Sequence, residues 1–121
     1  MIDHIGLFVS DAAQYADFCE KLLAPLGYVK KGAYPTAVCF ANDEDGDSVW
    51  LESPKDGNPV VPSHVAFRAK DEAAVKAFHE AGLASGGTDN GAPGPRPNYG
   101  PTYYAAFIHD PDGNNIEAML S

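Results

Sequence analysis

Positively charged residues are scarce in this chain. Lysine and arginine together number 8 against 17 aspartates and glutamates, so the formal net charge is −9 at pH 7. A surface this acidic repels phosphate backbones and anionic membrane surfaces. We therefore expect neither a nucleic-acid nor a membrane partner.

Long hydrophobic runs and cysteines are also lacking. No run approaches the roughly 20 residues of a transmembrane helix. Asp3 and His4 interrupt the start of the chain, where a signal peptide would be basic and then apolar. We therefore expect a cytoplasmic protein. Cys19 and Cys39 form no CxxC motif, which argues against a disulfide framework, and both are expected to be buried thiols.

What the chain does contain is an internal repeat. Residues 4–27 align without gaps on residues 64–87, with identities at eight of 24 positions. Further on, CFANDEDGDSVW aligns with AFIHDPDGNNIE, at an offset that has grown from 60 to 67 residues. A chain of 121 residues has the size of one domain. We expect a single domain over 1–121 with two modules, about 1–53 and 63–121.

Each half has the predicted order of strand, helix and further strands, which places the chain in the α+β class. Apolar residues first alternate as in a strand and then recur at helical spacing. Ser10 is the expected cap of the first helix, and Asp71 opens the second. The expected buried stripes are Tyr15, Phe18, Cys19, Leu22, Leu23 and Leu26 in the first helix and Val75, Phe78 and Leu83 in the second.

Glycine and proline make up nine of the 17 residues from 85 to 101. Such a composition excludes a helix or a central strand. We expect a long loop, either a functional lid or a solvated connection.

Hairpin pairing predicts which side chains share a sheet face. A turn over 110–113 would pair Ala106 with Glu117 and Tyr104 with Met119, placing these four on one face. In the first half, the same reasoning groups Cys39, Trp50 and Glu52. On the opening strands, the residues expected to point away from the helices are His4, Gly6, Phe8, His64, Ala66 and Arg68. Polar groups beside aromatic ones on one face are typical of a small-molecule site.

Two histidines and one carboxylate on this face are metal ligands by residue type. The 2-His-1-carboxylate set formed by His4, His64 and Glu117 leaves open positions on an ion such as Fe(II) or Mn(II). The duplication of the two histidines at the same step of the repeat favours ligation over a structural role. Trp50 occupies the place equivalent to Glu117 and cannot ligate. Glu52, two residues further on, is a candidate ligand or catalytic base.

Other side chains on this face have two interpretations each. Arg68 either binds an anionic group of a substrate or pairs with an acidic residue. Trp50 and Tyr104 either contact the substrate or pack against neighbouring side chains. Tyr99 is expected to contact the substrate. His79 and His109 are both expected at the surface.

Three motifs, DHIGLFVSD, SHVAFRAKD and DPDGNNIEAM, resemble the vicinal oxygen chelate superfamily, the group of glyoxalases, bleomycin resistance proteins and extradiol dioxygenases. The resemblance spans residues 1–121. It implies two βαβββ modules forming a curved, cup-shaped mixed sheet with helices on the outer face. It also implies metal ligands on the first strand of each module and on the final strand, which here are His4, His64 and Glu117.

The resemblance further implies a metal-dependent enzyme. Its cofactor would be a divalent ion (Fe, Mn, Zn or Ni), and its small substrate would chelate that ion through adjacent oxygens. Both lyase or isomerase chemistry and ring-cleaving dioxygenation stay open. Glyoxalase-type lyases use a fourth ligand where this chain has Trp50, whereas extradiol dioxygenases need only His, His and Glu. The alternative is a non-catalytic, bleomycin-resistance-like protein that binds a drug or metabolite. A homodimer is the implied assembly.

Overall fold

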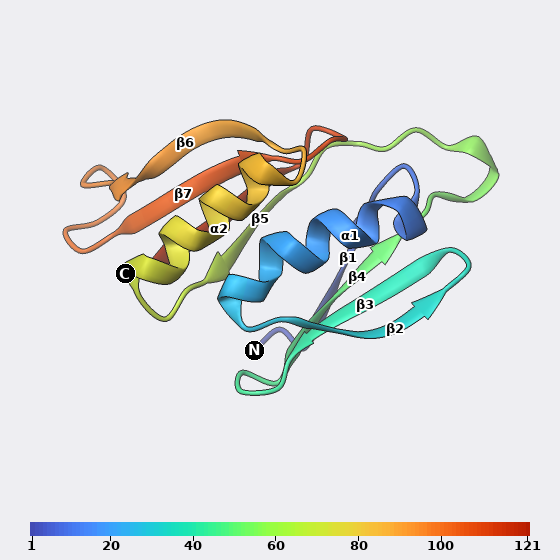
Figure 1. The fold of residues 1–121 in the computed structure, drawn as a ribbon, viewed down its shortest axis with the longest axis horizontal. Coiled ribbons are helices and arrows are strands. Elements are labelled where there is room, and N and C mark those ends of the chain that lie inside the picture. Colours follow the sequence, from blue (N-terminus) through green and yellow to red (C-terminus); the bar gives the residue numbers. More distant parts are fainter. The chain divides into compact units, whose positions relative to one another are not determined.

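The computed structural model describes the whole chain, residues 1–121, which divides into two compact units, 1–61 and 62–121. Each unit is one βαβββ module, as predicted (Figure 1). The first contains β1 (His4–Phe8), α1 (Ala12–Leu23), β2 (Val29–Tyr34), β3 (Ala37–Asn42) and β4 (Asp47–Glu52). The second contains β5 (His64–Arg68), α2 (Glu72–Ala84), β6 (Thr88–Pro95), β7 (Tyr104–His109) and β8 (Asn115–Leu120). Short 3₁₀ turns lie at Ala24–Leu26 and Lys55–Gly57.

The first module is a four-stranded mixed sheet with one helix packed on it. The strand order is β1-β4-β3-β2, with β1 parallel to β4 and the other pairs antiparallel. Helix α1 contacts β2, β3 and β4 (Figure 1). All six residues of its predicted stripe are buried. The cap is Asp11 rather than Ser10, because the Asp11 carboxylate accepts hydrogen bonds from the backbone N–H groups of Ala13 and Gln14.

The second module repeats this architecture, with strand order β5-β8-β7-β6 and α2 packed on β6, β7 and β8 (Figure 1). Two predictions for α2 are wrong. Leu83 is 45% exposed, because it lies five residues after Phe78 and therefore about 140° around the helix. His79 is only 8% exposed and lies one turn after buried Val75. Its Nε2 is 2.9 Å from the Asp89 carboxylate, which gives the buried ring a hydrogen-bond partner.

Part of the segment predicted as a long loop is a strand. Residues 88–95 form β6, which pairs with β7 at the edge of the sheet and shows two register irregularities. An edge strand tolerates the prolines and glycines that a central strand excludes. The following residues form a closed turn, because the Arg96 backbone N–H donates to the Tyr103 carbonyl at 2.7 Å.

The two hairpins differ by one residue in their turns. In the first, Cys39 lies opposite Trp50, which confirms the predicted register. In the second, Phe107 and not Ala106 lies opposite Glu117, so the predicted register is wrong by one. The chain turns over 110–114 rather than 110–113, because the Asp110 backbone N–H donates to the carbonyl of Asn114 at 3.0 Å.

This shift exchanges the two faces of β7. Phe107 joins Glu117 on the face away from α2, and Tyr104 turns to the opposite face. Ala106 and Ile108, which share the face of Tyr104, have no exposure. Both cysteines are free and buried, as predicted.

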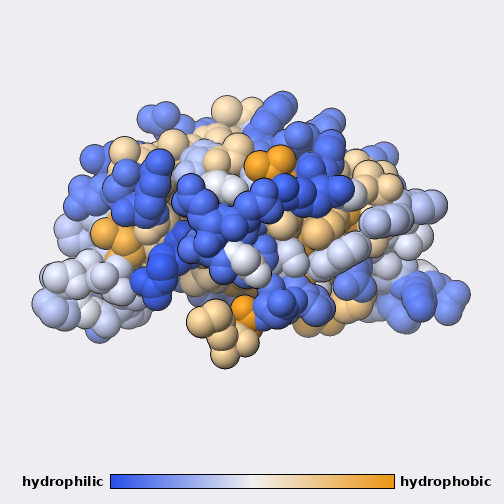
Figure 2. Space-filling model, turned by 90° about the horizontal axis from the view of Figure 1, so that it is seen from below, coloured by the Kyte–Doolittle hydropathy of each residue, from blue (hydrophilic) through white to orange (hydrophobic).

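Strongly hydrophobic residues appear as small separate patches among hydrophilic ones on the surface shown in Figure 2. The exposed large hydrophobic side chains are scattered over several elements, as is ordinary for a folded domain. Neither α1 nor α2 is long and apolar enough to cross a membrane.

Candidate functional site

A histidine and a carboxylate meet on the second module where β5 runs parallel to β8. His64 lies opposite Asn115 and Ala66 lies opposite Glu117, so His64 and Glu117 project from the same sheet face. The Nε2 atom of His64 is 3.1 Å from Oε2 of Glu117. The Glu117 residue is 3% exposed, whereas half of the His64 side chain is accessible. The carboxylate of Glu117 is therefore buried, whereas the imidazole of His64 is open to an incoming ligand.

A backbone carbonyl orients the His64 ring. Its Nδ1 lies 3.1 Å from the carbonyl oxygen of Asn115. A carbonyl oxygen only accepts hydrogen bonds, so Nδ1 is the donor in this contact, and Nε2 is the ring nitrogen that faces Glu117. Metal-binding histidines are commonly oriented by such a contact. In the first module, Nδ1 of His4 lies 2.7 Å from the carboxylate of Asp3.

Tyr103 holds the second oxygen of the buried carboxylate. Its hydroxyl donates to Oε1 of Glu117 at 2.8 Å. Burial, the hydrogen bond to Glu117 and the negative charge of Glu117 together raise the pKa of Tyr103 to about 12. The phenol is therefore protonated at neutral pH and remains a donor. Sequence reasoning missed Tyr103, because the one-residue register error assigned this face to Tyr104.

The donor set of this pair fits a divalent metal ion. Two ligand atoms that each lie about 2.1 Å from an ion at a right angle are about 3.0 Å apart. The His64 and Glu117 atoms are 3.1 Å apart. Neither module by itself groups three His, Cys, Asp or Glu side chains. The second module brings His64 and Glu117 together, and His4 lies on β1 of the first module.

The first module carries different groups at the equivalent positions. Trp50 lies opposite Gly6, just as Glu117 lies opposite Ala66. The Trp50 ring stacks on Tyr34 with a centroid distance of 6.0 Å, so it has a packing partner within its own module.

The carboxylate of Glu52 reaches back over β1. A Cβ atom built on Gly6 would lie only 2.7 Å from Oε1 of Glu52. Gly6 lies two positions after His4 on β1, so both residues belong to the same sheet face. The missing side chain at Gly6 thus leaves room for a carboxylate on the face that carries His4.

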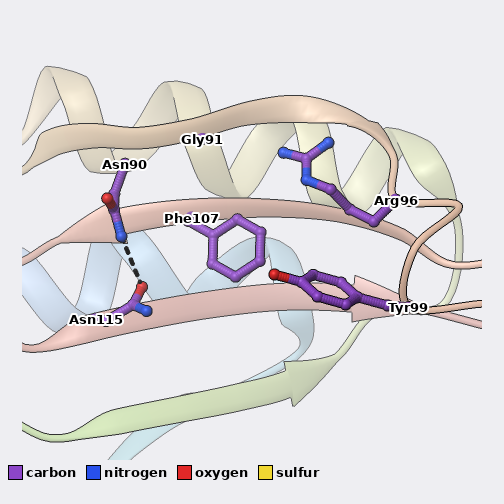
Figure 3. Close-up of a pocket in the computed structure, with 6 residues that line it drawn as sticks. All are labelled: Asn90, Gly91, Arg96, Tyr99, Phe107 and Asn115. Carbon is purple, nitrogen blue, oxygen red and sulfur yellow. Dashed lines mark hydrogen bonds between the residues drawn. The ribbon is translucent and has the colours of Figure 1, made fainter.

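A small cavity lies on the second module (Figure 3). Its volume is about 260 Å³. The ring of Phe107 stacks against His64, with centroids 6.4 Å apart and planes 22° apart. The Arg96 guanidinium carbon lies 5.5 Å from the Phe107 ring centroid. The lining residues are Asn90, Gly91, Arg96, Tyr99, Phe107 and Asn115.

The structure separates the other residues proposed for substrate contact. Tyr99 lines the cavity and Tyr104 lies on the opposite sheet face. Arg68 lies opposite Met119, two positions after Ala66 on β5, and its positive charge acts on Tyr103. Sequence reasoning missed Arg96 and Phe107 as cavity residues. Arg96 is the one basic residue in the Gly- and Pro-rich segment 85–101, and this isolation could have indicated a binding role.

The fold and the site define an α+β protein of two βαβββ modules that presents a histidine–carboxylate donor pair. A family model, the Glyoxalase/Bleomycin resistance protein/Dioxygenase superfamily, matches residues 1–118. The chain belongs to this superfamily, which confirms the resemblance of its three motifs.

Solved structures agree with this assignment. A glyoxalase/bleomycin resistance protein from Albidiferax ferrireducens is 31% identical, with a TM-score of 0.87 and 98% of each chain covered. A lactoylglutathione lyase from Agrobacterium tumefaciens is 23% identical, with a TM-score of 0.70, and the match covers 98% of this chain and 92% of that one. The second likeness concerns the fold alone. Among curated proteins, no match was found.

Proposed function

We propose that this protein is a metal-dependent enzyme whose small substrate chelates a divalent ion through two adjacent oxygens. The observation that carries the proposal is the His64–Glu117 pair, with donor atoms 3.1 Å apart and with Nδ1 of His64 committed to a backbone carbonyl. His4 is proposed as the third ligand, because it occupies the equivalent first-strand position of the other module. Fe, Mn, Zn and Ni are all compatible with this donor set. The family resemblance supports a homodimer as the working form.

Each residue of the proposed site has a distinct task. His64 and Glu117 are proposed to bind the divalent ion, and the hydroxyl of Tyr103 fixes the orientation of the buried carboxylate. When bound, the ion supplies a Lewis acid that polarises the chelating oxygens of the substrate. Glu52 is proposed to transfer a proton, because its carboxylate lies on the sheet face that carries His4. Lyase or isomerase chemistry and ring-cleaving dioxygenation are both compatible with these tasks.

Metal analysis tests the proposal. Protein purified without chelator, stripped and titrated with Zn²⁺ or Mn²⁺ should take up about one ion per chain. His64→Ala and Glu117→Gln should each weaken uptake by about tenfold or more. The matched controls are His109→Ala at the end of β7 and Glu80→Gln on the exposed side of α2. Failure of the folded wild-type protein to bind any ion would support the drug-binding alternative instead.

The placement of Glu52 has its own test. Gly6→Ala adds a methyl group where the Glu52 carboxylate lies, and a flexible side chain can move away at little cost in stability. We expect the ¹³C signal of the Glu52 carboxyl to shift strongly in this variant. Gly32→Ala on β2, which meets only the Tyr34 ring, serves as the control. Equal shifts in both variants would contradict the placement of Glu52 over Gly6.

A further inference from the structure

We infer that the cavity of the second module binds a planar aromatic carboxylate, as part of the substrate or as a product-like inhibitor. This inference deepens the proposed function and rests on it only for the link between the cavity and the metal ligands. It follows from the floor of the cavity, its charge and its size.

The floor of the cavity is an aromatic ring. Figure 3 shows Phe107 on β7 between two polar ends, with its ring turned nearly face-on to the viewer. The side chain is partly exposed and stacks against His64. A planar ring placed on Phe107 would therefore lie next to the imidazole of a proposed metal ligand.

One end of the cavity is cationic. Arg96 has five N–H donors, and three of its hydrogen bonds go to the backbone carbonyls of Ala92, Gly94 and Pro95. These bonds fix the guanidinium near the Phe107 ring and leave two donors without a protein partner. No acidic residue lines the cavity, although acidic residues outnumber basic ones 17 to 8 in the chain. A fixed, uncompensated guanidinium favours an anionic, planar group such as a carboxylate.

The other end of the cavity offers amides. The Nδ2 of Asn90 donates to Oδ1 of Asn115 at 3.1 Å (Figure 3). The Asn115 side chain retains an amide donor, and the Asn90 side chain retains a carbonyl acceptor. This end therefore fits a hydroxyl or carbonyl substituent on a ring whose carboxylate faces Arg96.

The size of the cavity suits a single ring. Its volume of about 260 Å³ is below the roughly 300–1,000 Å³ of drug-sized sites. Gly91 contributes to this space, because a Cβ atom there would lie 2.8 Å from Phe107 Cδ2 and 3.2 Å from Arg96 Nη2. Its φ of +152° also disfavours other residues at this step of β6.

The first experiment uses the wild-type protein and three probes. Benzoate, benzamide and cyclohexanecarboxylate are titrated into ¹⁵N-labelled protein, and the side-chain amide signals of Asn90 and Asn115 are followed. We expect benzoate to bind about tenfold more tightly than benzamide, which lacks the charge. It should also bind more tightly than cyclohexanecarboxylate, which lacks the flat ring. Equal affinities for benzoate and benzamide, or shifts confined to other parts of the protein, would overturn the inference.

The second experiment uses variants whose folding is checked by the same spectra. Arg96→Gln should abolish the preference for benzoate over benzamide, whereas Lys76→Gln, on the exposed side of α2, should leave it unchanged. Phe107→Leu should weaken benzoate several-fold and leave cyclohexanecarboxylate nearly unaffected. A benzoate preference that survives in folded Arg96→Gln protein would overturn the assigned role of Arg96.

Titrating metal-free and Zn²⁺-loaded protein separates this inference from the proposed function. Benzoate binding in a protein that takes up no ion would refute the proposed function and uphold the carboxylate subsite. Ion binding without any benzoate response in the Asn90 and Asn115 signals would uphold the proposed function and refute the subsite.

Discussion

Replacing Tyr103 by phenylalanine removes one oxygen atom from the proposed site and leaves the ring in place. That oxygen donates a 2.8 Å hydrogen bond to Glu117, a carboxylate that is 3% exposed. A hydrogen bond to a charged group contributes about 1.5–3 kcal/mol, and burial of the acceptor prevents full replacement by water. Tyr103 itself is partly exposed, which places the expected loss near the middle of this range. We therefore expect Tyr103→Phe to lower the free energy of unfolding by about 2 kcal/mol.

Tyr99 provides a matched control for this measurement. Its ring packs edge-on against Tyr103 with centroids 5.4 Å apart, and it is 62% exposed. Tyr99→Phe makes the same chemical change without orphaning a buried acceptor, so its effect should stay within about 0.5 kcal/mol. Urea unfolding of both metal-free variants at pH 7 measures the difference. A Tyr103→Phe protein no less stable than Tyr99→Phe would refute the argued role of the hydroxyl.

Two further predictions concern polar groups of the second module. Asn114 has no exposure, accepts from the Ser63 backbone N–H and donates to Asp110, both at 2.8 Å. Urea unfolding should therefore show a loss of about 2–4 kcal/mol for Asn114→Ala and almost none for exposed Asn98→Ala, and similar losses in both would contradict this. The hydrogen bond from His79 lowers the pKa of the Asp89 carboxyl. A depressed folded pKa stabilises the fold above the ordinary value of about 4, and this contribution is lost as pH falls through the folded pKa. His79→Ala should raise the Asp89 pKa in a ¹³C titration, and an unchanged value would contradict the assigned cause.

The architecture could be predicted because the sequence contains the same module twice. The alignment of residues 4–27 with 64–87 superimposes strand on strand and helix on helix. The register of the first hairpin also followed from its turn, since Asn42 pairs with Asp47 around four turn residues. The second hairpin shows the same acidic, Gly-containing pattern but includes one more residue in the turn. The Asp110 carboxylate accepts hydrogen bonds from the backbone N–H groups of Asp112 and Asn114 and so holds that extra residue. The hydropathy pattern does not indicate these hydrogen bonds.

The residues of the proposed site could be predicted only in part. His64 and Glu117 emerge from the repeat, because a strand-start histidine is duplicated and the final strand ends the second copy. Predicting Tyr103 and Phe107 requires the exact register of the second hairpin. A register error of one residue assigned their sheet face to Tyr104 and Ala106 instead. The cavity also depends on the irregular pairing of β6, where the register shifts around Gly91. Glycine and proline content indicates where such a strand is irregular, but not which side chains the irregularity brings together.

We propose that two imidazole rings and one buried carboxylate bind a single ion. X-ray absorption at the metal edge of protein loaded with one equivalent of Zn²⁺ tests this claim most directly, because imidazole rings leave a characteristic multiple-scattering signal. We predict two histidine nitrogens and at least one carboxylate oxygen at about 2.0–2.2 Å, with one nitrogen lost in His4→Ala and one in His64→Ala. A spectrum with one histidine or none, or one unchanged in either variant, would contradict the account.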